Sequence, residues 1–124
     1  MATTVTAVKK GFDQPDETRP FAEGTGQMAF VGVGDFTVGL GEYKPGWQWS
    51  KHVKPATGTD SCQAEHTGYV ISGRMVVKMN NGDEIEIGPG DAFHIPPGHD
   101  GWVVGDEACV LFDFTAAGRF AKKS

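Results

Sequence analysis

The residues of this chain best suited to chemistry are its four histidines, all of which lie between positions 52 and 99. Imidazole is the commonest protein ligand of the borderline transition metals, and a metal site needs three or four converging donors. The local patterns predict that His52 ends one strand, that His66 begins the next, and that His99 follows a Pro-Pro-Gly bend. Adjacent strand ends of an antiparallel barrel can point inward residues at one shared mouth. We therefore predict a metal site formed by His52, His66 and His99.

The other polar residues near these histidines have two interpretations each. Cys62 and Glu65 lie in the loop before His66, where either could supply a fourth donor or simply be solvated. His94 alternates with two apolar neighbours expected in the core, so we expect it to point outward or to be hydrogen-bonded. Lys54 is expected to be a surface lysine, and the alternative is an ammonium group at the pocket mouth that holds an anionic substrate.

Aromatic residues of the same region can line a pocket for an organic ligand, although aromatics that alternate along strands also form cores. We select Trp49, Tyr69 and Trp102, together with Lys54, as candidates for the substrate pocket. The sequence has no nucleophile elbow, P-loop, dinucleotide-binding fingerprint or Cys-x-x-Cys pair. The chemistries that these motifs mark are therefore disfavoured.

The elements that position these residues are expected to be short strands. The 18 glycines and 7 prolines follow no repeat, so they separate many short elements. Apolar and polar residues alternate along most segments, and Asn81-Gly82 is a strong hairpin signal because this pair tolerates positive φ values. Nine or ten short strands with no helical periodicity between them predict an all-β sandwich or barrel. The predicted strands are 27–33, 36–40, 47–53, 67–71, 74–79, 84–87, 92–95, 102–104 and 108–114.

A length of 124 residues suits one domain with its own core. Residues 1–26 are polar and interrupted by prolines and glycines, which predicts an N-terminal arm that packs on a neighbouring subunit. Residues 27–115 carry the strand pattern and form the predicted domain. Residues 116–124 form a C-terminal tail with room for a helical turn or two.

The composition excludes several kinds of partner. Eleven basic and sixteen acidic residues give a formal net charge of −5, and the basic residues form no cluster larger than a pair. This balance argues against a nucleic-acid or membrane partner. No apolar run approaches the length of a transmembrane helix and no signal-peptide core follows Met1, so we expect a cytoplasmic protein. In a reducing compartment, Cys62 and Cys109 are expected to stay free thiols.

Two segments resemble the paired motifs of the cupin superfamily, whose members are small jelly-roll β-barrels. The first motif runs Gly, five residues, His, one residue, His, a short gap, Glu, six residues, Gly. The second runs Gly, five residues, Pro, one residue, Gly, two residues, His. The resemblance covers roughly residues 40–114 and implies a single cupin-type jelly-roll β-barrel preceded by a polar N-terminal arm. The matching residues are Gly46, His52, Gly73, Gly90, Pro96 and Gly98.

The chain departs from these motifs at three of the four ligand positions. The second histidine is replaced by Lys54, which cannot bind a metal while protonated, and the glutamate is replaced by His66. The last histidine is replaced by Gly101, and His99 lies two residues earlier, on the same face of an extended chain. The loop between His52 and His66 is also longer than usual in the family.

The resemblance implies a metal-binding cupin that holds one divalent iron, manganese, nickel, copper or zinc ion. It also implies dioxygenase-, isomerase- or lyase-like chemistry on a small organic substrate, and a homodimer. The alternative function is a non-catalytic small-ligand-binding or sensor cupin, which the replaced positions Lys54 and Gly101 favour. A third hypothesis is a metal-free isomerase or lyase in which histidines act as acid and base.

Overall fold

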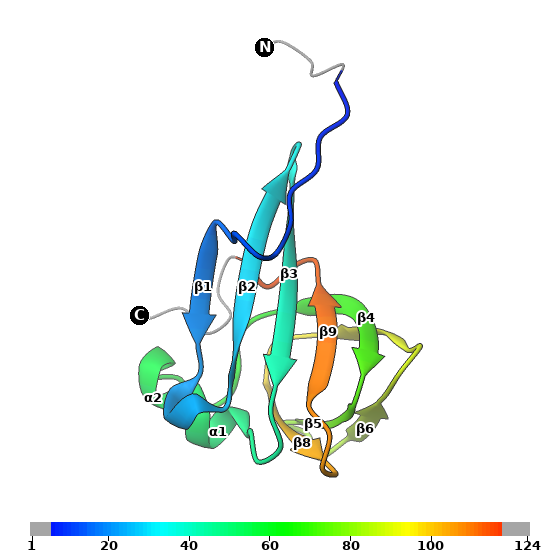
Figure 1. Cartoon of the computed structure of the whole chain (residues 1–124). Coiled ribbons are helices and arrows are strands. Elements are labelled where there is room, and N and C mark those ends of the chain that lie inside the picture. The colour runs from blue at the N-terminus through cyan, green and yellow to red at the C-terminus, as the bar shows by residue number, and fades with distance from the viewer. Residues whose placement is uncertain (1–5, 118–124) are drawn as a thin grey trace.

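The computed structural model describes residues 6–117, which form nine strands, two four-residue helices and one 3-10 turn (Figure 1). These elements confirm the all-β class that the sequence predicts. The helical elements are η1 (Ala22–Gly24), α1 (Trp49–His52) and α2 (Lys54–Thr57). The strands are β1 (Glu17–Pro20), β2 (Gly26–Val33), β3 (Phe36–Tyr43), β4 (His66–Ser72), β5 (Arg74–Met79), β6 (Glu84–Ile87), β7 (Ala92–Ile95), β8 (His99–Val104) and β9 (Cys109–Asp113).

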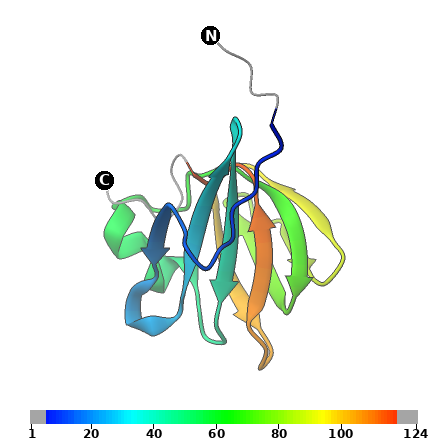
Figure 2. The ribbon, with the colours of Figure 1, turned by 45° about the horizontal axis from the view of Figure 1, so that its top comes forward.

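The strands form two antiparallel sheets packed face to face in a jelly-roll arrangement (Figures 1 and 2). One sheet has the order β1-β2-β3-β9-β4-β7 and the other has the order β6-β5-β8. Because β4 pairs with β9 and β5 pairs with β8, the chain passes from one sheet to the other at Gly73. Gly73 has a φ of +74°, and a Cβ at this position would lie 2.2 Å from the carbonyl oxygen of Ala108. The crossing between the sheets therefore requires glycine.

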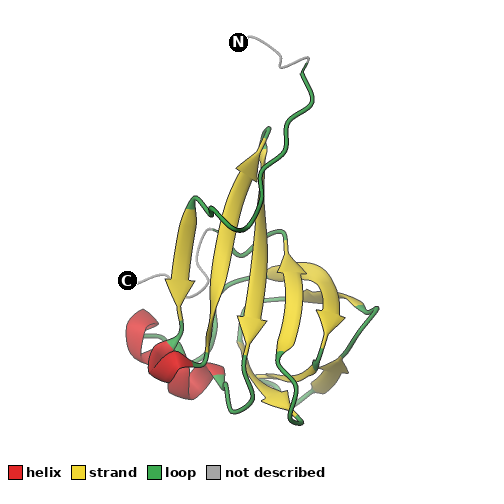
Figure 3. Ribbon diagram, viewed as in Figure 1, coloured by secondary structure: helices red, strands yellow, loops and turns green. Residues whose placement is uncertain are grey.

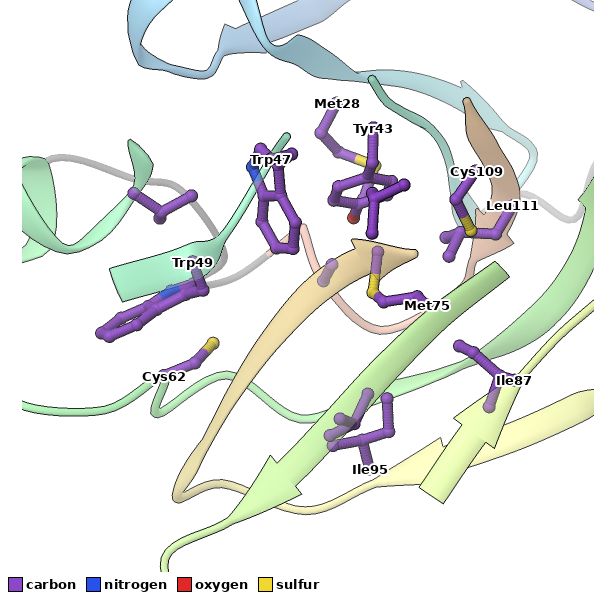
Figure 4. Packing of buried hydrophobic residues seen from close by; sticks show 14 of the residues in the cluster. Met28, Tyr43, Trp47, Trp49, Cys62, Met75, Ile87, Ile95, Cys109 and Leu111 are labelled. Carbon is purple, nitrogen blue, oxygen red and sulfur yellow. The ribbon is translucent and has the colours of Figure 1, made fainter. Parts of the chain in front are cut away.

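The interior between the sheets receives every second residue of β4, β5, β7, β8 and β9. His66 and Val70 are buried in β4, and His99 and Val103 are buried in β8. Asp113 is buried at the end of β9. The period that buries the apolar side chains of the core (Figure 4) thus also carries three polar side chains into the interior.

The segment predicted as a strand over residues 47–53 is helical instead, and the helices gather at one end of the sandwich (Figure 3). Gln48 forms only an isolated β-bridge, and α1 follows it directly. The carboxylate of Asp100 in β8 accepts hydrogen bonds from Ser50 N at 3.1 Å and from Gln48 Nε2 at 3.2 Å. It therefore satisfies an amide of the first helical turn from a distant part of the sequence. Within residues 6–117, no helix is long and apolar enough to cross a membrane.

The polar arm predicted for residues 1–26 contains an edge strand, because β1 pairs with β2 in the large sheet. Its polar composition hides this strand in the sequence. Arg19 is buried with its guanidinium 4.5 Å from the centre of the Phe30 ring, and its Nη2 donates to the carbonyl oxygen of Ala117 at 2.6 Å. The helical turn predicted for the tail falls mostly on residues 118–124, which lie outside the described residues.

Candidate metal centre

Three side chains from two neighbouring segments bring metal-binding atoms together inside the sandwich. The Sγ atom of Cys62 and one ring nitrogen each of His66 and His99 all lie within 4.8 Å of one another, and all three residues are buried. His66 begins β4 and His99 begins β8. Cys62 lies in the loop before β4, and this loop is bonded to β8: Cys62 N donates to His99 O and Gly98 N donates to Cys62 O, both at 2.7 Å. The backbone therefore fixes the spacing of two donors.

The ring of His66 is oriented by a buried carboxylate. Its Nδ1 lies 2.5 Å from Oδ2 of Asp113, and the other oxygen of Asp113 accepts hydrogen bonds from Thr115 N and Ala116 N at 3.1 and 3.0 Å. Because the carboxylate is an acceptor, Nδ1 of His66 carries the proton. Nε2 is then the metal-binding atom, and it lies 3.7 Å from Cys62 Sγ. A carboxylate–histidine pair of this kind is a common support of metal ligands.

A backbone carbonyl orients the ring of His99, as the Asp113 carboxylate orients that of His66. Its Nδ1 donates to the carbonyl oxygen of Pro96 at 2.8 Å, and a carbonyl can only accept. The lone pair of His99 is therefore on Nε2. The rings of His66 and His99 meet edge to face with their centroids 5.3 Å apart. Both histidines thus present the same nitrogen to one site.

Interactions within this cluster lower the pKa of Cys62 and raise the pKa of His66. Burial alone would raise the pKa of the Cys62 thiol, but hydrogen bonds and charge from His66 and His99 lower it to about 6. Burial alone would lower the pKa of His66, but its hydrogen bonds to Asp113 and Cys62 raise it to about 9. Both shifts favour a thiolate on Cys62 beside an imidazolium on His66.

This donor set fits a transition metal. One thiolate and two neutral imidazoles are ligands of zinc and copper, and the hydrogen bonds to Asp113 and Pro96 leave both Nε2 atoms available. Three protein donors leave at least one coordination position for another ligand. The predicted histidine-containing metal site thus has a candidate in the structure, and a cysteine is one of its three donors.

A cavity of about 30 Å³ adjoins the cluster, and His66, His99 and Asp113 form part of its wall. The remaining wall is mostly apolar and includes Trp47 and Trp49. The cavity is about twice the size that one water molecule needs. Burial raises the pKa of Tyr43, another wall residue, well above its usual range, so that its phenol stays protonated.

The structure does not bring His52 into this cluster. His52 lies in α1, where its Nδ1 accepts a hydrogen bond from Gln48 N at 3.0 Å and its Nε2 lies 3.5 Å from a carboxylate oxygen of Glu23. The predicted strand would have pointed this histidine at the barrel mouth, and the helix turns it toward η1 instead. Lys54 begins α2 and lies 3.9 Å from Asp60, with its side chain 42% exposed, and it does not line the cavity.

The other predicted residues are divided between the wall and the surface. Trp49 lines the cavity, whereas Tyr69 is exposed on β4 and Trp102 is half-buried on β8 outside the cavity wall. Glu65 is exposed, and its carboxylate lies 3.7 Å from Nε2 of His94. His94 is exposed and hydrogen-bonded to Thr67, as the alternation in its strand predicts.

Two residues of the site, Cys62 and Asp113, are indicated by features of the sequence other than the histidine pattern. Counted backwards from Gly73, with three residues in the short gap of the first motif, the second histidine of that motif falls on Cys62. Counting forwards from Gly46 placed the same position on Lys54, because the longer loop separates the two counts. Asp113 follows Cys109 by an even number of residues, so a strict period of two assigns it to the buried face.

The two-sheet jelly-roll fold and the buried histidine-containing cluster define a class of small β-proteins with a candidate metal centre between the sheets. The family model described as "Cupin domain" matches residues 39–115. This chain belongs to the cupin family. No match is found among curated proteins.

Solved structures similar to this chain support the fold. The polyketide cyclase RemF from Streptomyces resistomycificus has a TM-score of 0.60 at 21% identity, covering 89% of this chain and 79% of that one. KdgF from Halomonas sp. has a TM-score of 0.56 at 20% identity, covering 83% and 88%. A protein of unknown function (DUF1255) from Acinetobacter sp. ADP1 has a TM-score of 0.58 at 16% identity, covering 89% and 92%. At these identities the likeness concerns the fold alone.

Proposed function

We propose that this cupin binds one divalent transition metal ion through Cys62, His66 and His99, and that the site and its cavity bind a small organic molecule. The observation that carries the proposal is the convergence of three buried donor atoms within 4.8 Å. The hydrogen bonds from His66 to Asp113 and from His99 to Pro96 add to it, since both leave Nε2 free for a metal.

Zinc is the ion that this donor set favours among the five suggested by the family resemblance. Thiolate and imidazole ligands suit zinc and copper, whereas manganese prefers oxygen ligands. Zinc sites with three protein ligands and one open position are typically catalytic. When bound, such an ion supplies Lewis acidity toward a ligand oxygen.

The chain's own residues would orient the ligand and keep water out. Asp113 and Pro96 hold the two imidazoles, and the apolar wall excludes water around them. Tyr43 stays protonated, which suits it to donate a hydrogen bond rather than to accept a proton. We therefore place isomerase- or lyase-like chemistry on a small organic substrate first among the activities of this site.

Metal binding is tested by removing single donors. Wild-type protein purified without chelators is expected to hold about one equivalent of zinc, and Cys62→Ser and His99→Gln to hold little, because each removes one of three ligands. His94→Gln and His52→Gln are the matched controls, since both remove a histidine outside the cluster. Circular dichroism verifies that each variant is folded.

Cobalt substitution gives a second test that depends on the thiolate. A cobalt–thiolate charge-transfer band should appear in the wild-type protein and in His52→Gln, and it should be absent from Cys62→Ser. Metal retained in both donor variants, or lost from folded His52→Gln, contradicts the proposed ligand set.

A non-catalytic ligand-binding or sensor protein is the second candidate function. The observation in its favour is that the described cavity wall offers no carboxylate or amine apart from Asp113, which is already bonded to His66. Metal-loaded protein that binds small ligands but shows no turnover across a panel of carbonyl compounds would favour this function. Activity that survives complete removal of metal would instead favour acid–base catalysis by His66.

A homodimer remains a prediction for this chain. Its support in the structure is a set of exposed apolar side chains, which include Phe36 at 74% exposure and Phe114 at 52%. Light scattering at micromolar concentration distinguishes a dimer from a monomer.

A further inference from the structure

The turn that follows β5 contacts both segments that carry the cysteine and the second histidine of the cluster. Asn80 is the first residue after β5, and its backbone N–H donates to the carbonyl oxygen of Gly98 at 2.9 Å. Its side-chain Nδ2 donates to Oγ of Ser61 at 3.1 Å. Gly98 directly precedes His99, and Ser61 directly precedes Cys62. One residue of the turn is thus bonded to the neighbour of each of two metal-binding residues.

Gly98 leaves the room that the Asn80 amide needs. Its φ is +96°, and a Cβ at this position would lie 3.1 Å from Nδ2 and 3.7 Å from Cγ of Asn80. A side chain at position 98 would therefore press on the amide where it bonds to Ser61. The glycine of the Pro-Pro-Gly bend and the asparagine of the turn fit each other closely.

The loop residue that Asn80 holds is itself well ordered. Ser61 is 9% exposed, and its hydroxyl oxygen also accepts from Nε2 of Gln63 at 3.0 Å. The carbonyl oxygen of Ser61 accepts from Oγ1 of Thr59 at 2.9 Å. Gln63 and Thr59 belong to the loop, whereas Asn80 belongs to the turn between β5 and β6. The bond from Asn80 therefore sets where this part of the loop lies relative to the small sheet.

The same two segments meet beside the cluster in the isolated β-bridge between Cys62 and His99. Cys62 N donates to His99 O and Gly98 N donates to Cys62 O, both at 2.7 Å. An isolated bridge has few hydrogen bonds that resist its opening, so another contact between the same segments should keep it closed. Asn80 supplies such a contact.

We propose that Asn80 is a positioning residue of the metal centre. Through its bonds to Ser61 and Gly98, it holds the loop before β4 against the start of β8. It thereby fixes the distance between the Cys62 sulfur and the His99 ring. The inference rests on the proposed function for its effect on metal affinity. It goes beyond that function because it gives the β5–β6 turn, which lies outside the described cluster, control over the spacing of two ligands.

Asn80→Ala tests this role, and Asn81→Ala is the matched control. Asn81 is equally exposed in the same turn, and its side chain bonds to Asp83 within that turn. Among residues 6–117, Glu23 is the one non-glycine residue with a positive φ, so alanine strains neither position. Asn80→Ala should weaken zinc binding about three- to tenfold, the equivalent of one neutral hydrogen bond, and Asn81→Ala should stay within about twofold of wild type. Competition with a chromophoric chelator measures each dissociation constant.

Ser61→Ala removes the same contact from its other end, and it keeps the test informative where Asn80→Ala fails to fold. It should weaken zinc binding at least as much as Asn80→Ala, because the hydroxyl oxygen also bonds to Gln63. The double variant should bind zinc no more weakly than Ser61→Ala alone, since both substitutions break one bond. In cobalt-loaded protein, the visible ligand-field bands should change in Asn80→Ala and keep their wild-type form in Asn81→Ala.

Hydrogen exchange of the metal-free protein separates this inference from the metal site. The amides of Cys62 and Gly98 form the bridge, so both should exchange about three- to tenfold faster in Asn80→Ala than in Asn81→Ala. Faster exchange in a protein that binds no zinc would support the positioning role and refute the metal proposal. Full zinc binding with unchanged exchange would refute the positioning role alone.

The proposal is overturned if folded Asn80→Ala binds zinc as tightly as Asn81→Ala, or if its bridge amides keep their wild-type exchange rates. Losses that multiply in the double variant would also overturn it, because the two side chains would then act independently. A fall in urea stability without either change would show that Asn80 stabilises the hairpin and does not position the ligands.

Discussion

Replacing Asp113 with asparagine should weaken zinc binding about 10- to 100-fold while leaving the fold intact. The carboxylate receives Nδ1–H of His66 on one oxygen and the amides of Thr115 and Ala116 on the other. Asparagine can keep the two backbone bonds through its remaining oxygen, but its NH₂ group then faces the Nδ1–H of His66. Two donors cannot pair, so the imidazole either loses its support or moves its proton to Nε2, where the metal would bind.

The expected loss follows from supports of this kind in other metal sites, where removing one costs about 10- to 100-fold, or about 1.4–2.7 kcal/mol. Competition with a chromophoric chelator measures the zinc dissociation constant of wild type and Asp113→Asn. Asp91→Asn is the matched control, because the exposed Asp91 carboxylate also accepts a backbone hydrogen bond, from Gly88 N at 2.8 Å. A zinc affinity within threefold of wild type in a folded Asp113→Asn protein would refute the argument that Asp113 sets the His66 tautomer.

Four further predictions concern the protons released on zinc binding, the pH dependence of stability, the cavity wall and the backbone. Zinc binding at pH 7.5 should release about one proton, measured by calorimetry in buffers of different ionisation enthalpy, because Cys62 is already a thiolate and His66 must lose its proton. In the metal-free protein, the stability that Cys62 contributes is lost as pH falls through about 6, and that of His66 is lost as pH rises through about 9. The stability difference between wild type and Cys62→Ser should therefore grow as pH rises from about 6 toward 9, the ordinary pKa of a thiol, and a flat pH profile would contradict the lowered pKa of Cys62. Gly101→Ala should keep the melting temperature, measured by calorimetry, within a few degrees of wild type, since the added Cβ makes only ordinary contacts. Gly73→Ala and Gly82→Ala share a positive φ, but only the first places a Cβ against a carbonyl oxygen, at 2.2 Å, so urea denaturation should show a larger loss for Gly73→Ala.

The strands could be predicted from the sequence because they depend on local alternation. The period of two and the Asn-Gly turn locate β5, β6 and β7 with their observed bounds. The helices at 49–57 could not be predicted in this way, since the carboxylate that caps α1 comes from Asp100, fifty residues later than Ser50. In this case a contact between distant residues overrides a local strand pattern.

The candidate site was predicted only in part, for a related reason. His66 and His99 lie in or beside strands with clear alternation, so their inward positions could be inferred. Cys62 lies among polar residues that suggest a solvated loop, and its burial follows from the backbone bridge to His99, which no local pattern reveals. His52 was expected at the site because of its motif spacing, but the helix that contains it turns the side chain toward Glu23.

The same long-range pairing explains why the centre is organised before any metal enters. Cys62 and His66 are four residues apart on one segment, and two backbone hydrogen bonds of 2.7 Å tie that segment to β8 beside His99. The register of β4 and β9 pairs Gly68 with Asp113, which places the carboxylate diagonally opposite His66. Each donor is thus positioned by a sheet or bridge contact rather than by a flexible side chain alone. A metal ion that binds here has little ordering to impose, and its affinity should depend on the loop–β8 bridge as much as on the identity of the three ligands.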